Sequence, residues 1–421
     1  MSMQRRDFLK AGVAAAAAGL AGCAGLPGAG SKARVVVVGG GYGGATAAKY
    51  IRLFDPSIEV VLVEPNEAFI SCPISNLVLG GFKTMADITT PYTGLERNHG
   101  IRIVRDMATA IDADRKQVRL ARGEPIAYDR VIVSPGIDFI AGAIPALDGA
   151  AAATVLHAWK AGAQTTALRR QLEEMGDGGV YVLAIPEAPY RCPPGPYERA
   201  SQVAAYFKKA KPRSKVLILD ANANITSKGP LFRKAWSELY PGMIEYRPNS
   251  KAVDVDAGAR RIKLEVDDVA GDVLNVVPPM KAGRIADAFI TANKRWCGVD
   301  WLTFESTAAK GVHILGDSTL SAPGMPKSGH MANAQGKACA AAVVALLNGE
   351  APNAAPSLTN TCFSFVSDSL VVHVASVHKY DTAAKTFKTV PGSGGVSAAM
   401  NELEAGHALN WARNIWADTL T

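Results

Sequence analysis

Several features that would place this chain in a common functional class are missing from its 421 residues. No Cys-x-x-Cys-His motif occurs, so the chain carries no c-type haem of its own. No run of Lys or Arg exceeds two or three residues, which gives nucleic-acid binding little support. The Ala/Gly-rich apolar stretch at 11–26 is too short and too rich in glycine to span a membrane. With 48% hydrophobic and 20% charged residues, what remains is a globular protein of two or three domains.

The strongest local pattern is an unbroken Val run at 35–38 that ends in Gly39-x-Gly41-x-x-Gly44 and continues into an Ala-rich helical pattern at 45–52. β-Branched residues without polar alternation predict a parallel strand that is covered on both faces. The three glycines permit a tight turn, close approach of a pyrophosphate, and close packing of helix on strand. The helix N-terminus then offers free N–H groups to the phosphates.

A second predicted strand, residues 58–63, ends in Glu64 about 20 residues after the glycines, as the dinucleotide motif requires. Its carboxylate is placed to accept hydrogen bonds from a ribose 2′-OH. A glycine turn without a ligand is the alternative, but the strand–turn–helix–strand context favours an adenine dinucleotide.

The first 31 residues are predicted to be an export signal outside the fold. Arg5-Arg6 precedes Phe8-Leu9-Lys10 and an Ala-rich stretch, a pattern typical of twin-arginine export to the periplasm. Leu20-Ala21-Gly22-Cys23 also resembles a lipoprotein cleavage site, so either Cys23 is lipidated or the match is a coincidence. No other attachment to a membrane is expected.

Removal of the signal lowers the formal charge from +7 to about +5 and leaves five of the six cysteines. In an oxidising compartment, an odd count implies at least one free or otherwise used sulfur. A mildly basic surface is compatible with an acidic partner or an anionic substrate.

Further motifs follow in the order expected of an FAD protein. A loop at 68–76 follows the second strand, a strand ending in a turn occupies 128–136, and a short apolar strand at 311–317 ends in Gly316-Asp317. In FAD proteins of this type, that Asp binds the ribityl chain or the pyrophosphate. A helix predicted at 329–347 would direct its positive N-terminus at the flavin pyrimidine, where reduction places negative charge.

An inserted α/β unit, roughly 151–282, lies between these flavin segments. Its strand at 179–185 is followed by residues 186–200, a stretch rich in Pro and bulky side chains, where a second glycine fingerprint would bind NAD(P)H. Proline cannot supply N–H donors. NAD(P)H is therefore not expected to exchange electrons with this protein, although the strand at 215–220 continues the nucleotide-type topology.

At this point the residues match a known family. The chain resembles the flavoprotein subunit of flavocytochrome c sulfide dehydrogenase over essentially its whole length. The motifs that carry the resemblance are the twin-arginine signal, the glycines at 39–44, Cys72 with Ser75-Asn76, residues 192–202 (Cys-Pro-Pro-Gly-Pro-Tyr-Glu-Arg-Ala-Ser-Gln), Gly316-Asp317, residues 325–329 and Leu358-x-Asn360-Thr361-Cys362. The stretch that begins at Cys192 is the most specific of them.

The resemblance implies an α/β fold with two Rossmann-like domains of the glutathione-reductase type and a C-terminal α+β domain. The expected organisation is a signal at 1–31, an FAD-binding domain at 32–150 and 283–351, a second Rossmann-like domain at 151–282, and an interface domain at 352–421. A strand is expected at 371–377. A Trp-containing helix is expected at 398–416, and its ordinary role would be to pack one apolar face against the core.

The resemblance also implies site residues. The expected FAD-binding residues are Gly39, Gly41, Gly44, Glu64, Cys72, Asn76, Gly316 and Asp317. Cys72 would form a thioether to the flavin 8α-methyl carbon, and the ordinary alternative is a buried free thiol.

Cys192 and Cys362 would form a redox-active disulfide, or alternatively a structural link. Glu198 would be a base or electrostatic gate beside them, or only a helix-cap carboxylate. Cys297 and Cys339 are expected to be buried structural residues, and no metal site is expected.

The implied activity is oxidation of hydrogen sulfide through the disulfide and FAD, with electrons passed to a separate c-type cytochrome subunit in a heterodimer. Two alternatives stay open. One is an enzyme that resembles sulfide:quinone oxidoreductase, although the polar residues of the C-terminal helix make it a poor membrane helix. The other is a non-catalytic flavin-binding protein of a sulfur-oxidation pathway.

Overall fold

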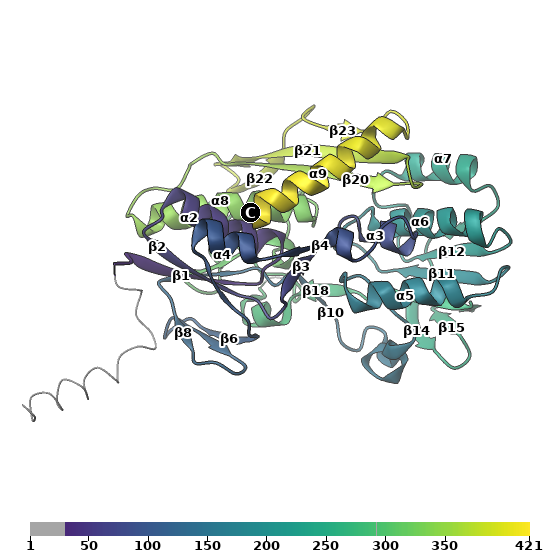
Figure 1. Ribbon diagram of the computed structural model, residues 1–421, viewed down its shortest axis with the longest axis horizontal. Helices are drawn as coiled ribbons and strands as arrows, with labels where there is room; N and C mark the ends of the chain where they lie inside the picture. Colours follow the sequence, from purple (N-terminus) through teal and green to yellow (C-terminus); the bar gives the residue numbers. More distant parts are fainter. Residues whose placement is uncertain (1–29, 292) are drawn as a thin grey trace, which may run out of the picture.

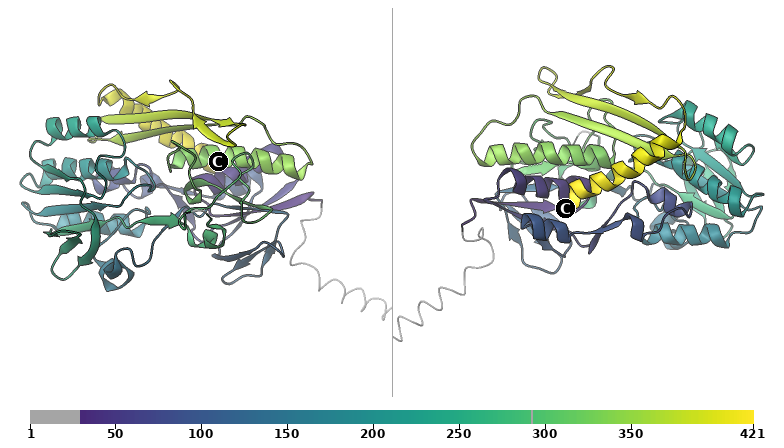
Figure 2. Two further views of the ribbon diagram at one scale, coloured as in Figure 1. Left: turned by 180° about the vertical axis from the view of Figure 1, so that it is seen from behind. Right: turned by 45° about the horizontal axis from the view of Figure 1, so that its top comes forward.

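The computed structural model describes residues 30–291 and 293–421 (Figure 1). The twin-arginine pattern and Cys23 lie outside these residues. Two α/β units lie side by side, and a C-terminal layer covers both of them (Figures 1 and 2). Within the described ranges, none of the helices combines the length and the apolar character needed to cross a membrane.

The first unit is built on a five-stranded parallel sheet with the order β19-β9-β1-β2-β5. Its strands are β1 (Ala33–Val38), β2 (Ile58–Val63), β5 (Arg102–Val104), β9 (Arg130–Val133) and β19 (Val312–Ile314). All six residues of β1 are buried, as the Val run predicts for a strand covered on both faces. Helices α2 (Tyr42–Phe54) and α8 (Gly329–Leu347) pack against each other beside this sheet (Figure 1).

Smaller elements complete this unit. The antiparallel sheet of β6 (Ala108–Asp112), β7 (Gln117–Leu120) and β8 (Ile126–Ala127) lies between β5 and β9 in the chain. Between β2 and β5 lie β3 (Ala68–Ile70), α3 (Ser75–Leu79), β4 (Thr89–Pro91) and α4 (Thr93–His99). Short 3₁₀ helices occur in this unit at η1 (Ala86–Ile88), η4 (Arg284–Phe289) and η5 (Gly316–Ser318), while η2 (Pro145–Asp148) and η3 (Ala150–Ala153) pack with the second unit.

The second unit contains a four-stranded parallel sheet with the order β13-β12-β11-β17. Its elements are α5 (Ala163–Glu174), β11 (Val180–Ile185), α6 (Gly195–Ala210), β12 (Lys215–Asp220), α7 (Gly229–Leu239), β13 (Ile244–Arg247) and β17 (Val273–Val276). A small antiparallel sheet is formed by β14 (Ala252–Asp256), β15 (Arg261–Leu264) and β16 (Asp268–Ala270). The antiparallel pair β10 (Ile137–Phe139) and β18 (Met280–Ala282) lies where the chain enters and leaves this unit.

The C-terminal layer consists of β20 (Ser357–Phe365), β21 (Val371–Asp381), β22 (Thr386–Thr389), β23 (Gly395–Val396) and α9 (Glu402–Leu420). Strand β20 contacts both α8 of the first unit and α6 of the second. Because β20 spans the boundary between the units, a residue in its middle can reach both of them (Figure 2).

Most predicted elements coincide with the observed ones, including the strands at 58–63 and 215–220 and the helix at 329–347. The C-terminal helix differs: it begins at Glu402, where Asn401 caps it by accepting a hydrogen bond from the N–H of Glu404, and it continues to Leu420. The strand predicted at 371–377 runs to Asp381 because β22 extends the pairing.

Candidate active site

The glycine turn after β1 has the geometry that a dinucleotide needs. Gly39 adopts φ +98°, and a Cβ there would lie 2.4 Å from the carbonyl oxygen of Ser134. A Cβ at Gly44 would lie 1.9 Å from the carbonyl oxygen of Gly39, so helix and strand approach closely. A Cβ at Gly41 would meet no atom within 4 Å. The second glycine therefore borders open space, where a cofactor phosphate fits.

Glu64 lies directly after β2 and is 7% exposed. Its Oε2 accepts a hydrogen bond from the N–H of Gly40 at 2.7 Å, and its Oε1 accepts from the Asn66 side chain at 2.6 Å. The carboxylate is thereby fixed at the edge of the cavity next to the glycine turn. This is the position expected for the ribose-binding acid.

Asp317 closes the other side of this cavity. It lies in η5 after β19, and its buried Oδ1 has no hydrogen-bond partner among the described residues. Burial raises the pKa of Asp317, while Arg191 and Lys327 act in the opposite direction. A buried oxygen without a partner is costly, so the geometry calls for a donor from a bound molecule.

The cavity has a volume of about 220 Å³ and is lined by residues from separate segments, namely Gly39–Gly43, Glu64, Phe69, Ile70, Cys72, Pro73, 134–136, Arg191, Gly316, Asp317, Gly329 and Ala332. Helix α8 begins at this cavity, with the Ser328 hydroxyl as its N-cap. A fixed carboxylate, an unpartnered carboxylate oxygen and a helix N-terminus fit the ribose, ribityl hydroxyls and diphosphate of FAD. Six of the eight predicted cofactor residues line this cavity, and the exceptions are Gly44 and Asn76. Gly44 instead allows the helix to pack closely on the glycine turn.

The cysteines at 72, 192 and 362 line a second, mostly apolar cavity. It adjoins the first, because Cys72, Pro73, Arg191 and Gly329 line both. Cys72 lies at the junction, where its sulfur accepts a hydrogen bond from the N–H of Ala161 at 3.4 Å. The cysteine predicted to link the flavin and the two predicted redox cysteines therefore line one cavity.

Cys192 belongs to the second unit and Cys362 to the C-terminal layer, but both line this cavity. Cys192 lies in the loop before α6, and its backbone N–H donates to the carbonyl of Lys327 at 2.8 Å. Cys362 lies in the middle of β20, opposite Val374 of β21. All five described cysteines are thiols, and the thiols of Cys192 and Cys362 lie close enough in this cavity for each to shift the pKa of the other. That interaction and burial raise the pKa of Cys192. The same interaction, aided by Lys228, lowers the pKa of Cys362.

Glu198 lies in the first turn of α6 and lines the cysteine cavity. Its Oε1 accepts from the backbone N–H of Phe365 at 2.9 Å, and its Oε2 accepts from Asn76 Nδ2 at 2.9 Å. Burial raises the pKa of Glu198 and so favours its protonated form.

Asn76, a predicted cofactor residue, does not line the dinucleotide cavity, and its contact with FAD stays a prediction. Its Nδ2 donates to Glu198 and to the carbonyl of Gly195, and its Oδ1 accepts from Arg199 Nε at 3.2 Å. Asn76 lines the cysteine cavity and not the dinucleotide cavity. It holds Glu198 in place, a role that requires α3 and α6 to pack together and that local sequence does not reveal.

Two non-glycine residues that line the cysteine cavity have left-handed backbone, and so does Lys228, which contacts the Cys362 carbonyl. Ile74 has φ +75°, Cys192 has φ +59° and Lys228 has φ +57°. Such conformations cost of order 1–3 kcal/mol each and collect at functional sites. Ile74 is β-branched, which makes its conformation the least expected of the three.

The second parallel sheet offers no comparable dinucleotide site. Asp220 is the last residue of β12, a position similar to that of Glu64 directly after β2. Its Oδ2, however, accepts hydrogen bonds from the hydroxyls of Tyr197 at 2.7 Å and Tyr246 at 3.0 Å. A Cβ at Gly195, the first residue of α6, would lie 2.9 Å from Cys192 Sγ. The carboxylate and helix N-terminus that would hold NAD are thus occupied by the protein itself.

Sequence reasoning missed four residues of the cysteine cavity: Trp159, Arg191, Arg199 and His330. Arg191 and Arg199 lie within or beside the family motif at 192–202 and were accessible from it. Trp159 and His330 carry no local signal, since only the packing of separate segments brings them to the cysteines. Cys297 and Cys339 are fully buried away from this cavity, and burial raises the pKa of Cys297 to about 12.

Four protein-family models match parts of the chain. The central-domain model of the sulfide dehydrogenase [flavocytochrome c] flavoprotein chain matches residues 165–278, and the flavin-binding model of flavocytochrome c sulphide dehydrogenase matches 354–420. A pyridine nucleotide-disulphide oxidoreductase model matches 33–183, and a twin-arginine signal model matches 2–22. The chain therefore carries a signal for twin-arginine export to the periplasm. The first two matches include Cys192 and Cys362 respectively.

Individual relatives extend the comparison. The flavoprotein chain of sulfide dehydrogenase [flavocytochrome c] from Chlorobaculum thiosulfatiphilum is 69% identical over 45 residues, 11% of this chain and 94% of that sequence. Mitochondrial sulfide:quinone oxidoreductase from Mus musculus is 25% identical over 309 residues, 68% of this chain and 65% of the mouse protein.

Solved structures show the fold. Sulfide:quinone oxidoreductase from Aquifex aeolicus superposes with a TM-score of 0.72 at 18% identity, covering 92% of this chain and 91% of that one. Putidaredoxin reductase, in its covalent complex with putidaredoxin, gives a TM-score of 0.66 at 17% identity, covering 91% and 94%. The predicted α/β fold is confirmed. The chain belongs to the flavoprotein family of flavocytochrome c sulfide dehydrogenase, whose members are FAD-dependent oxidoreductases.

Proposed function

We propose that this protein oxidises hydrogen sulfide through a Cys192–Cys362 disulfide and FAD, and that a separate c-type cytochrome takes the electrons. The observation that carries this proposal is the meeting of the two thiols in a cavity that adjoins the dinucleotide cavity. The family membership and the names of the relatives support the choice of sulfide as substrate.

Hydrosulfide attacks one sulfur of the disulfide, and the S–S bond breaks. One cysteine becomes a persulfide, and the other receives the bonding electron pair as a thiolate. A second hydrosulfide attacks the outer sulfur of the persulfide and releases HS–S⁻, which leaves both cysteines reduced. Re-forming the disulfide releases two electrons, so two hydrosulfides yield one disulfide anion, one proton and two electrons. FAD, when bound, supplies an acceptor that takes this pair and returns the electrons singly.

Glu198 acts as the acid–base group of this site. Burial favours its neutral form, which can hold the proton released during disulfide re-formation or return one to a cysteine. Its negative form raises the pKa of Cys192, so the protonation state of Glu198 also affects which thiol ionises.

Cys72 forms the thioether to the flavin 8α-methyl carbon in this proposal. The support is its position where the two cavities adjoin, half-buried and close to the backbone of residues 159–161. A covalent link would retain the cofactor in a compartment without a free FAD pool.

The electrons leave to a c-type cytochrome because this chain contains no haem-attachment motif and the family name describes a flavocytochrome. A quinone acceptor is the second candidate, favoured by the 309-residue similarity to the mouse sulfide:quinone oxidoreductase. Reduction of decylubiquinone by sulfide in the absence of any cytochrome would support the quinone.

The test is an anaerobic titration of the purified FAD-loaded protein with sulfide, followed by flavin absorbance with and without a cytochrome c. We expect bleaching near one flavin per two sulfides, and return of the oxidised spectrum on adding ferricytochrome c. A flavin that sulfide does not bleach would refute the proposal and favour a non-catalytic flavin-binding protein.

A further inference from the structure

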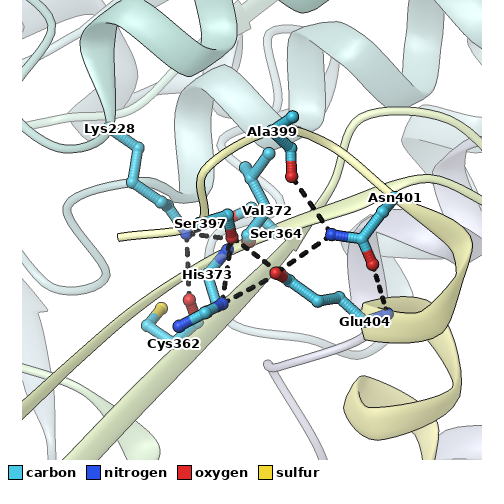
Figure 3. Close-up of polar contacts among 9 residues, drawn as sticks. All are labelled: Lys228, Cys362, Ser364, Val372, His373, Ser397, Ala399, Asn401 and Glu404. Atoms are coloured by element: carbon cyan, nitrogen blue, oxygen red, sulfur yellow. Dashed lines mark hydrogen bonds and ion pairs between the residues drawn. The ribbon is translucent and has the colours of Figure 1, made fainter. Parts of the chain in front are cut away.

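Lys228 is a buried lysine beside the cysteine cavity whose contacts are all with neutral groups. It lies immediately before α7 and is 7% exposed. Its Nζ donates to the carbonyl of Cys362 at 2.9 Å, to Ser364 Oγ at 2.8 Å and to the carbonyl of Val372 at 3.4 Å (Figure 3). Its three N–H donors are thus satisfied, but its positive charge is not.

The two carboxylates whose charges act on Lys228, Glu198 and Glu404, are already engaged elsewhere. Glu404 accepts hydrogen bonds from Ser397 Oγ at 2.6 Å and from His373 Nδ1 at 2.9 Å, and its other oxygen accepts from Asn401 (Figure 3). Both oxygens of Glu198 are likewise occupied. Among the residues that the structure describes, no carboxylate lies within 4.0 Å of Lys228.

A buried ammonium without a counter-ion is unstable in proteins, so an anion close by would be strongly favoured. Burial lowers the pKa of Lys228, and the charge that opposes this most is that of Cys362, ahead of Glu198 and Cys192. A thiolate at Cys362 is therefore the counter-ion that the site lacks.

We propose that Lys228 is the fixed positive charge that stabilises the Cys362 thiolate when the disulfide opens. This inference rests on the proposed function, since it assigns a positioning residue to the same pair of cysteines. It makes the two sulfurs unequal: hydrosulfide attacks Cys192 Sγ, the S–S bond breaks, and its electron pair goes to Cys362 Sγ beside Lys228. The persulfide then forms on Cys192.

Other ionisable groups lie around the same pair, and of these Glu198 acts on both cysteines and Arg191 on Cys192. These groups are Cys72, Arg191, Glu198, Arg199 and His330, which line the cavity, and Glu404, which acts on Lys228 from α9. None of them contacts Cys362 through a hydrogen bond to its backbone carbonyl, as Lys228 does. Removal of the Lys228 charge should therefore affect Cys362 more than Cys192.

A purely structural role must be separated from this electrostatic one, because Lys228 also ties the start of α7 to β20 and β21. Lys228→Gln keeps an N–H donor for the carbonyls and removes the charge. Lys228→Arg keeps the charge. Lys234→Gln, at an exposed position of the same helix, is the matched control.

The experiment measures alkylation of Cys362 and Cys192 by iodoacetamide in FAD-loaded protein that is first reduced with dithiothreitol and then freed of the reductant under argon. Each site is quantified by mass spectrometry across pH, and thermal melts are run on the same samples. Relative to wild type, we expect Lys228→Gln to slow Cys362 alkylation at pH 7 about tenfold, the effect of a one-unit rise in a thiol pKa. Lys228→Arg and Lys234→Gln should stay near the wild-type rate, and Cys192 should change less.

Folded, FAD-loaded Lys228→Gln protein that alkylates at the wild-type Cys362 rate would overturn the inference. If that variant does not fold, the wild-type profile decides: Cys362 must form its thiolate at lower pH than Cys192, and the reverse order overturns the inference. Sulfide bleaching is scored separately. A wild-type protein that sulfide does not bleach refutes the proposed function and leaves the alkylation comparison standing.

Discussion

The Glu198 carboxylate accepts a hydrogen bond from the backbone N–H of Phe365 at 2.9 Å, and this contact joins α6 to β20. The segment before α6 carries Cys192, and β20 carries Cys362, so the contact fixes the two cysteines opposite each other. Gln202 adds a second tie, since its Nε2 donates to the carbonyl of Phe365 at 2.9 Å. The site is therefore held by the interface between the second unit and the C-terminal layer, and not by either alone.

Replacing Cys72 tests the covalent flavin. Acid-denatured wild-type protein should retain its yellow colour in the pellet, whereas Cys72→Ala should release FAD into the supernatant. The fold and much of the FAD content should survive, because Glu64, Asp317 and the glycine turn do not depend on Cys72. Finding all of the wild-type flavin in the supernatant would rule out the thioether.

Two glycine substitutions separate cofactor binding from folding. A methyl group at Gly41 meets no protein atom within 4 Å, so Gly41→Ala should fold normally but bind FAD more weakly, because the methyl intrudes on the phosphate site. A methyl at Gly44 would lie 1.9 Å from the carbonyl oxygen of Gly39, and Gly44→Ala should lose about 1–3 kcal/mol of stability. Flavin content and urea unfolding of both variants test this; equal behaviour would contradict it.

NADH and NADPH should not reduce the flavin. Asp220, the acid that would bind the nicotinamide dinucleotide ribose, is fully buried and hydrogen-bonded to Tyr197 and Tyr246. Anaerobic mixing with stoichiometric NADH should leave the flavin spectrum unchanged, while dithionite in the same cuvette bleaches it. Rapid bleaching by NADH would show that the second sheet still forms a nucleotide site.

His313 should make the protein acid-sensitive. Its Nδ1 donates to the carbonyl of Thr303 and its Nε2 accepts from Arg130, so the fold requires the neutral ring. Burial lowers the pKa of His313 to about 4. Because the folded pKa lies below the unfolded value, the unfolded chain binds the proton first. The neutral ring therefore contributes its whole stabilisation above pH 6.5. As pH falls towards 4, the free energy of unfolding decreases by on the order of 2–3 kcal/mol.

The measurement is the free energy of unfolding in urea between pH 7 and pH 4.5. His313→Asn keeps a donor for Thr303 and removes the titration, so its stability should fall less steeply with acid than that of wild type. His407→Asn, at an exposed position of α9, is the control. A wild-type slope in His313→Asn would assign the acid sensitivity to other groups.

The dinucleotide site could be predicted from the sequence because its determinants are local. Each determinant can be recognised within a few residues: a buried Val run, three glycines at fixed spacing and an acid after the next strand. The observed β1, β2 and Glu64 agree with these predictions. The strand before Asp317 was predicted for the same reason.

The cysteine site could be only partly predicted, because tertiary contacts between distant segments build it. The family motif identified Cys192, Cys362 and Glu198, but the amide of Asn76 contacts Glu198 and not the cofactor cavity. Lys228 carries no motif at all, and only the tertiary hydrogen bond from its side chain to β20 reveals its place beside Cys362. Asp220 has the sequence position of a ribose-binding acid. Only the structure shows that its carboxylate is already hydrogen-bonded to tyrosine side chains of the protein.

The most direct test of the central claim compares Cys192→Ser and Cys362→Ser in sulfide turnover and in thermal melts. Each single variant should keep its FAD but lose nearly all sulfide-dependent bleaching, and the double variant should lose little more, because the two sulfurs act as one unit. A structural disulfide would instead lower stability by about 2–5 kcal/mol and leave catalysis in whatever protein remains folded. Folded, flavin-loaded Cys362→Ser protein that turns over sulfide at the wild-type rate would contradict the account.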